Sequence, residues 1–98
     1  MSLPRPADIV AFWRKAGPEK WFAKDSAFDT EIRQRFLPAY EAAAAGQLDD
    51  WQDTPEGAYA LLILLDQFPR NLFRGSPQAF ATDPKALAIA RHAVAEGF

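Results

Sequence analysis

The chain has no cysteine and a single histidine, His92, among its 98 residues. Without thiols it cannot form disulfides, iron–sulfur clusters, thiolate zinc sites or a cysteine nucleophile. One imidazole cannot make a histidine cluster, and we expect His92 on an outer helix face rather than in a catalytic triad. The lack of cysteine fits a reducing compartment, so we expect a cytoplasmic protein.

Long apolar runs and a large net charge are also absent. The longest apolar run, residues 58–65, is far shorter than the roughly 20 residues that span a bilayer. Residues 1–6 hold no apolar region of the kind that signal peptides carry. The net charge of −2 supplies no basic field that would attract nucleic acid or anionic lipid. We therefore expect neither a membrane nor nucleic acid as a partner.

The composition that is present is that of an ordinary globular protein, with 49% hydrophobic, 24% charged and 13% aromatic residues. Residues with β-branched side chains are few, and apolar residues recur at spacings of three and four rather than two. This pattern predicts one all-helical domain over residues 1–98.

Two helices are predicted in the first half of the chain. The first covers residues 6–15 and ends where Gly17 can adopt a left-handed conformation and the proline after it cannot continue the helix. The second begins at Asp25 or Ser26, either of which can cap free backbone N–H groups, and it ends at Gly46.

Apolar spacing predicts which faces of these two helices are buried. In the first helix the inward residues are Ile9, Phe12 and Trp13. In the second they form one stripe at successive four-residue steps, made of Phe28, Ile32, Phe36 and Tyr40. Pro38 lies within that stripe and removes a backbone hydrogen bond, so it predicts a bend.

The third helix has the clearest start, because Thr54 supplies a cap and Pro55 suits the first helical position. We predict that it ends at Gln67, since Pro69 disfavours helical geometry at Phe68. A short helical turn can restart at Pro69.

Two further pairs of a capping residue and a proline mark the end of the chain. Ser76 opens a short turn around Phe80, and Asp83 opens a last helix that Gly97 closes. The residues predicted to face inward in this helix are Leu87, Ala90 and Val94. Short connections favour antiparallel neighbours, so we expect helical hairpins stacked in a tetratricopeptide-like or orthogonal bundle arrangement.

The apolar segment 60–65 runs directly into Asp66, an acid near the end of its helix, where the helix dipole disfavours an anion. Arg70 and Arg74 follow at four-residue steps, and either can pair with a carboxylate. Two interpretations stay open. Either Asp66, Arg70 and Asn71 form a buried clamp across the proline break, or one arginine holds an anionic ligand. In the second case Arg74 and Asn71 are the better candidates for contact with the ligand.

Aromatic residues at helical spacing usually belong to a core, as we expect for Phe12, Trp13, Trp21, Phe22 and Phe28. Trp51 is an exception, because it lies among loop acids, where its ring can cover a helix end with one edge exposed. The candidate ligand-binding residues are therefore Asp66, Gln67, Arg70, Asn71, Arg74 and Trp51.

The acidic pairs Asp25/Asp29 and Asp49/Asp50 are not expected to bind a metal ion, because Asp25 already has a capping role and exposed loop acids are common. No Gly-rich phosphate loop, nucleophile elbow or metalloprotease motif occurs in the sequence. We therefore predict no catalytic residue, no metal and no cofactor.

The leading functional hypothesis is a helical binding module that holds a protein segment or a small anionic ligand near residues 66–74. In this hypothesis Arg70 and Arg74 supply the anion contacts. An alternative is a fragment of a hydrolase-like enzyme that acts on an anionic substrate, with Asp66 as acid or base. A third hypothesis is a purely structural assembly domain.

Several segments, in order along nearly the whole chain, resemble the family catalogued as domain of unknown function 924. They are Phe12-Trp13, Trp21 to Asp25, Phe28-Asp29, Gly46 to Trp51, Thr54 to Gly57, Leu64 to Asn71, Arg74-Gly75 and Phe80 to Asp83. The resemblance implies a mainly bacterial, all-helical protein with a tetratricopeptide-like fold and no established activity.

The chain departs from this family at its end. The resemblance implies that members continue past the point matching Gly97 into further helices with a Pro-Phe-x-His-Ser-Glu-like segment, so this chain resembles the N-terminal half of a longer domain. A helix pack divided there would expose an apolar face. We therefore predict that the chain self-associates as a symmetric dimer that covers its last helices.

Overall fold

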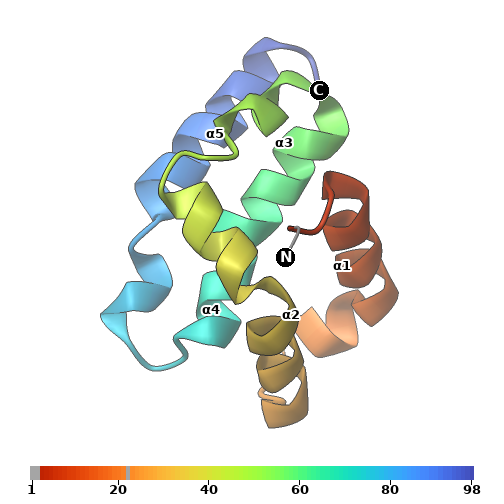
Figure 1. The fold of residues 1–98 in the computed structure, drawn as a ribbon, viewed down its shortest axis with the longest axis vertical. Coiled ribbons are helices and arrows are strands. Elements are labelled where there is room, and N and C mark those ends of the chain that lie inside the picture. Colours follow the sequence, from red (N-terminus) through yellow and green to blue (C-terminus); the bar gives the residue numbers. More distant parts are fainter. Residues whose placement is uncertain (1–2, 22) are drawn as a thin grey trace.

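The protein is built of helices packed around one core, and the part of the chain that the structure describes contains no β-strand (Figure 1). The computed structural model describes residues 3–21 and 23–98. The helices are α1 Pro6–Trp21, α2 Ser26–Ala44, α3 Pro55–Leu62, α4 Phe68–Leu72 and α5 Asp83–Ala95. Shorter turns are the 3-10 turns η1 Asp49–Asp53 and η3 Pro77–Phe80 and the π-helical turn η2 Ile63–Gln67. The predicted all-α class is confirmed, and no described helix is long and apolar enough to cross a bilayer.

The start of the chain follows its local signals. α1 is interrupted at Gly17, whose φ of 75° lies in the left-handed region that glycine adopts without strain. The side chain of Asp25 caps α2 by accepting hydrogen bonds from the backbone N–H groups of Ala27 and Phe28. The break at Gly17 and the cap at Asp25 confirm the prediction, but the predicted end of the first helix is wrong, because α1 resumes after Gly17 and runs on to Trp21. The predicted core position Phe22 lies outside the described residues.

α2 carries its predicted stripe into the core, since Phe28, Ile32, Phe36 and Tyr40 are all buried. The helix continues through Pro38 and ends at Ala44. Gly46 then takes a φ of 86°, and its N–H donates to the Ala43 carbonyl, which closes the helix as predicted.

α3, η2 and α4 form one helical rod, because the residues at their junctions all have helical backbone angles. Thr54 caps the rod as predicted, by accepting from the Gly57 N–H at 3.0 Å. The predicted boundary at Gln67 and the predicted helical turn near Pro69 correspond to the end of η2 and to α4, but the predicted break between them is absent, because Phe68 has helical angles and the rod continues to Leu72. The wider turn makes this possible: the Phe68 N–H donates to the Ile63 carbonyl, five residues back instead of four.

Pro69 has no N–H for the Leu65 carbonyl, which would be its partner in a regular helix. Thr82, just before α5, supplies the missing donor, since its hydroxyl lies 2.6 Å from the Leu65 carbonyl oxygen. This hydrogen bond joins α5 to the rod at the point where the rod's own hydrogen bonding is interrupted.

We expect Thr82→Val to lower the free energy of unfolding by about 1–2 kcal/mol, because valine keeps the shape but removes the hydroxyl that donates to the Leu65 carbonyl. Thr30→Val is the matched control, since the Thr30 hydroxyl donates to the Ser26 carbonyl on the exposed side of α2. That change should cost no more than about 0.5 kcal/mol. Urea unfolding followed by circular dichroism measures both, and equal costs would contradict the role given to Thr82.

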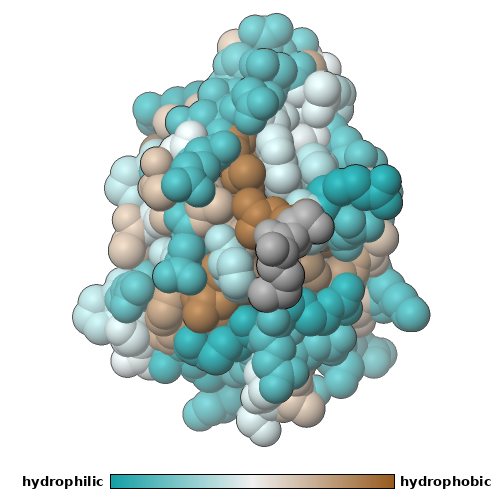
Figure 2. All heavy atoms as spheres, in the orientation of Figure 1, coloured by the Kyte–Doolittle hydropathy of each residue, from teal (hydrophilic) through white to brown (hydrophobic). Residues whose placement is uncertain are grey.

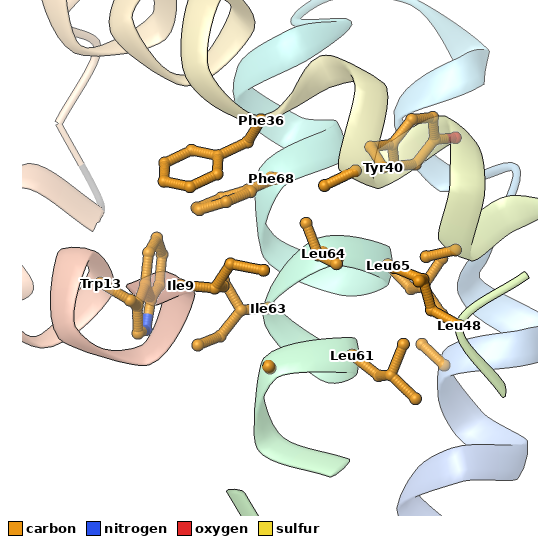
Figure 3. Close-up of a cluster of buried hydrophobic side chains, with 14 of the residues drawn as sticks. Ile9, Trp13, Phe36, Tyr40, Leu48, Leu61, Ile63, Leu64, Leu65 and Phe68 are labelled. Atoms are coloured by element: carbon orange, nitrogen blue, oxygen red, sulfur yellow. The ribbon is translucent and has the colours of Figure 1, made fainter. Parts of the chain in front are cut away.

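The core lies on the inner side of the rod. Phe68 is fully buried, and its ring centroid lies 5.0 Å from that of Phe36 and 5.9 Å from that of Trp13. Figure 3 shows these rings gathered at one end of the buried cluster, with Leu64 and Leu65 continuing it along the rod. Such close ring contacts add to the stabilisation that comes from burying apolar area.

The rod is also the centre of the arrangement, because α3 packs between α1 and α5 while α2 lies over η2 and α4 (Figure 1). Figure 2 shows the same face of the molecule, where hydrophilic side chains cover most of the surface and apolar ones are exposed near the centre. Helices from both halves of the chain therefore meet at the segment that contains Asp66.

The predicted inward face of α5 is wrong. Ala86 and Ile89 are buried against α3, whereas Leu87 is 52% and Val94 81% exposed. α5 has apolar residues on two sides, and the side with small alanines allows the closer approach to the rod. The side that carries Leu87 and Val94 stays exposed.

Candidate functional site

Asp66 and Arg70 form the ion pair that the sequence predicts, one helical turn apart at the junction of η2 and α4. Nη1 of Arg70 lies 3.0 Å from Oδ1 of Asp66 and also donates to the Asp66 backbone carbonyl. Oδ2 of Asp66 accepts a hydrogen bond from the Gln67 amide at 2.7 Å. Because both charged side chains are partly exposed, the pair contributes no more than about 1 kcal/mol of stability. It does fix the direction of Arg70.

A second network is centred on Asp29, in the first turn of α2. Its two carboxylate oxygens accept hydrogen bonds from Nε and Nη2 of Arg74, at 2.8 and 2.9 Å. Oδ1 also accepts from the amide of Asn71 at 2.8 Å. Arg74 therefore holds Asp29 in the planar two-pronged geometry that gives the strongest arginine–carboxylate pairs.

The charge state of Asp29 follows from these contacts. Burial acts to raise the pKa of the carboxyl, but the hydrogen bonds from Arg74 and Asn71 and the charge of Arg74 outweigh it, so the pKa lies below its ordinary value. The hydrogen bond to Asp29 likewise raises the pKa of the Arg74 guanidinium. Asp29 is thus held as an anion.

The predicted clamp of Asp66, Arg70 and Asn71 is corrected in one respect. Asn71 is buried, but it donates to Asp29 on α2 instead of joining Asp66. Asn71 and Arg74 are three residues apart, a spacing that places two side chains on the same side of a helix. This spacing is the one signal that could have suggested a shared partner. Nothing in the sequence pointed to Asp29, because it lies far from both along the chain.

The two networks border one cavity of about 380 Å³. Five of the predicted ligand-binding residues line it: Asp66, Gln67, Arg70, Asn71 and Arg74. The sixth lining residue is Trp21, which the sequence analysis assigned to the core. The Trp21 indole N–H donates to the Trp13 carbonyl at 2.7 Å, and the two rings stack 4.8 Å apart. These contacts hold the Trp21 ring as a fixed wall of the cavity.

Trp51 is not among the residues that line this cavity. It lies in η1, before the first turn of the rod, and packs partly buried against the core. Gly57 sits so close to the Trp51 carbonyl that any larger residue there would overlap it. The structure therefore places Trp51 at the opposite end of the rod from Arg70.

The acidic pairs have other partners. Asp25 accepts from Lys20 at 2.8 Å as well as capping α2, and Asp49 pairs with Lys85 at 2.8 Å. Within residues 3–21 and 23–98, no group of three or more acidic, histidine or cysteine side chains could hold a metal ion.

With this geometry established, the chain can be compared with known proteins. A family model described as "Bacterial protein of unknown function (DUF924)" matches residues 9–98. The chain belongs to the DUF924 family. The match covers every residue that lines the cavity. No curated protein matches the chain.

A solved structure of a protein of unknown function, ATU0120 from Agrobacterium tumefaciens, is similar to this DUF924 chain. The two are 53% identical and superpose with a TM-score of 0.91 over 94% of this chain. The match covers 52% of the Agrobacterium chain, so the DUF924 chain described here spans about half the length of that relative.

Proposed function

We propose that this protein is a helical binding module that takes a small anionic ligand, or the anionic group of a protein segment, at Arg70. The observation that carries the proposal is that Arg70 borders the cavity with hydrogen-bond donors unused. Its pair with Asp66 occupies Nη1, whereas Nε and Nη2 have no hydrogen-bond acceptor within the described part of the chain. The proposal includes the tetratricopeptide-like stacking of the helices, which the family resemblance implies.

The surroundings of Arg70 support this role. The guanidinium carbon lies 5.5 Å from the centroid of the Phe80 ring, which covers one face of the group. A stacked guanidinium still presents its N–H groups along its edge, in the spacing that a carboxylate or phosphate accepts. The edge of Arg70 is therefore suited to an anion.

Arg74 is less suited to this contact than the sequence suggested. Two of its three guanidinium nitrogens already hold Asp29. We therefore assign the ligand contact to Arg70 and a supporting role to Arg74 and Asn71, which fix the wall of the cavity against α2.

The expected affinity is modest. The charges of Asp29 and Asp66 balance those of Arg70 and Arg74, so an anion gains hydrogen bonds rather than net attraction. For inorganic phosphate we expect a dissociation constant on the order of 1 mM, which corresponds to about 4 kcal/mol of binding free energy. A larger ligand that also contacts the Trp21 ring should bind more tightly.

Nuclear magnetic resonance can test the proposal, because the indole N–H signals of Trp21 and Trp51 report on opposite ends of the rod. On titration with inorganic phosphate we expect saturable shifts for the backbone of α4 and for the Trp21 indole. The Trp51 indole, at the other end of the rod, should stay unchanged. An equal shift of Trp51 would instead support its place in the predicted site and count against the cavity at Arg70.

The matched variants are Arg70→Ala and Arg35→Ala. Arg35 has the same kind of contacts as Arg70, since it pairs with Glu31 one turn away at 3.2 Å and lies over aromatic rings, but it is outside the cavity. We expect Arg70→Ala to abolish the phosphate shifts and Arg35→Ala to preserve them. Shifts that survive in Arg70→Ala would overturn the proposal.

A further inference from the structure

A second hollow borders the two arginines of the candidate site. It has a volume of about 460 Å³, and its wall includes Arg70, Arg74, Ser76, Pro77, Ala79 and Phe80. Apart from the arginines, these residues belong to the turn after α4 and to η3, which packs against α4. Both arginines also line the cavity of about 380 Å³, so the pair faces two separate spaces.

The two spaces differ in charge. Asp66 lines the cavity, whereas no acidic residue of the described chain lines the second hollow. Asp29, the carboxylate that holds Arg74, lines neither space. An anion that enters the second hollow therefore meets two guanidinium groups and no carboxylate on the same wall, which favours its binding.

Unused hydrogen-bond donors are available at this wall. Nε and Nη2 of Arg70 and Nη1 of Arg74 have no acceptor within residues 3–21 and 23–98, and the two side chains are 43% and 35% exposed. The Ser76 hydroxyl accepts from the Gln78 N–H at 3.2 Å and donates to no acceptor in the same part of the chain. Because a phosphate group offers three acceptor oxygens, one more than a carboxylate, it can use more of these donors.

The rest of the wall is largely apolar and includes an exposed aromatic ring. Phe80 is 56% exposed, and its ring centroid lies 5.5 Å from the guanidinium carbon of Arg70. Pro77 and Ala79 line the hollow with it. An aromatic ring on a ligand can cover this surface while a phosphate on the same ligand reaches the arginines.

We propose that the anion site takes a small aromatic molecule that carries a phosphate group, with its ring in the second hollow. The proposal rests on the proposed function, because Arg70 holds the anion in both. The phosphate accepts from the unused donors of Arg70 and Arg74, and the ring packs against Phe80 and Pro77. The alternative is that the ring packs against Trp21, but the other residues that line that cavity are polar, so the second hollow suits an apolar ring better.

Titration of the full chain with phenyl phosphate and with inorganic phosphate, followed by nuclear magnetic resonance, separates the effect of the ring from that of the anion. We expect phenyl phosphate to bind about tenfold more tightly, because its ring buries apolar surface that inorganic phosphate leaves exposed. Nuclear Overhauser effects should connect the phenyl protons of the ligand with the ring of Phe80. Benzoate, which has the same ring but only two oxygens, should bind more weakly than phenyl phosphate.

The outcomes separate this inference from the proposed function. If inorganic phosphate binds at Arg70 and phenyl phosphate binds no more tightly, the inference is wrong and the anion site stands. If neither binds, both are wrong. A phenyl ring that contacts Trp21 in place of Phe80 would overturn the inference, and tighter binding of benzoate would contradict the choice of phosphate.

The matched variants are Phe80→Ala and Phe98→Ala. Phe98 is also an exposed phenylalanine, at 45%, but it lines neither space. We expect Phe80→Ala to remove the advantage of phenyl phosphate and to keep the affinity for inorganic phosphate within about twofold, whereas Phe98→Ala should change neither. An advantage that persists in Phe80→Ala would count against the second hollow. Circular dichroism checks that both variants remain folded.

Discussion

Truncation of Phe68 to alanine is expected to lower the free energy of unfolding by about 3–5 kcal/mol, the usual cost of removing a fully buried phenylalanine ring. Phe68 is 0% exposed and contacts the rings of Phe12, Trp13 and Phe36. Because domains are stable by only about 5–15 kcal/mol, the loss should leave a substantial unfolded population near physiological temperature. Urea unfolding at room temperature, followed by circular dichroism, measures the difference.

Phe80→Ala is the control for this change. It removes the same ring from a position that is 56% exposed, so we expect a loss below about 1 kcal/mol. If the two variants lost similar stability, Phe68 would not be the centre of the aromatic cluster that joins α1, α2 and the rod.

The second large effect is expected for Asp29→Ala, with a loss of about 2–3 kcal/mol. The change leaves the buried amide of Asn71 without its acceptor and Arg74 without its carboxylate, and the partial exposure of Arg74 limits the cost. Glu31→Ala, on the same helix, removes an ion pair between two half-exposed side chains and should cost no more than about 0.5 kcal/mol. Thermal unfolding of the two variants separates a structural network from an ordinary surface pair.

The Asp29 network also has a predicted pH dependence. The pKa of Asp29 is lower in the folded protein than its ordinary value of about 3.9, so the folded state favours the ionised form. The stabilisation is therefore complete above the unfolded pKa and is lost as the pH falls through the folded pKa. The stability difference between wild type and Asp29→Ala should be constant near neutral pH and should shrink below about pH 4. A difference that persists unchanged in strong acid would show that ionisation of Asp29 is not its source.

Local signals predicted the fold where neighbouring residues decide the outcome. The caps at Asp25 and Thr54 and the break at Gly17 depend on backbone groups within a few residues, and each is present. The predicted break at Pro69 is absent, and there the Leu65 carbonyl accepts a hydrogen bond from Thr82, seventeen residues after Leu65 in the chain. Local sequence correctly indicates that a proline removes one backbone hydrogen bond of a helix. A hydroxyl from a distant part of the chain can donate to the carbonyl that lost its partner, and the helix can then continue.

The sequence predicted the pair of Asp66 and Arg70 but not the partner of Asn71 and Arg74. Five of the predicted ligand-binding residues do meet at one cavity, because they share a short stretch of the rod and the turn after it. The partner of Asn71 and Arg74 could not be found in the same way, since Asp29 lies 45 residues from Arg74 and reaches it only through the packing of α2. Likewise, α5 has two apolar sides, and only the packing against α3 selects which one is buried.

The wide turn at Ile63–Gln67 also decides which way the end of the rod faces. A regular helix advances about 100° per residue, so one additional residue held in a turn rotates everything beyond it by that angle. In this orientation Asn71 and Arg74 point toward α2, where Asp29 can receive them. A chain with one residue fewer in this turn would keep every side chain of the network and yet aim them a quarter of the way around the rod, away from their acceptor.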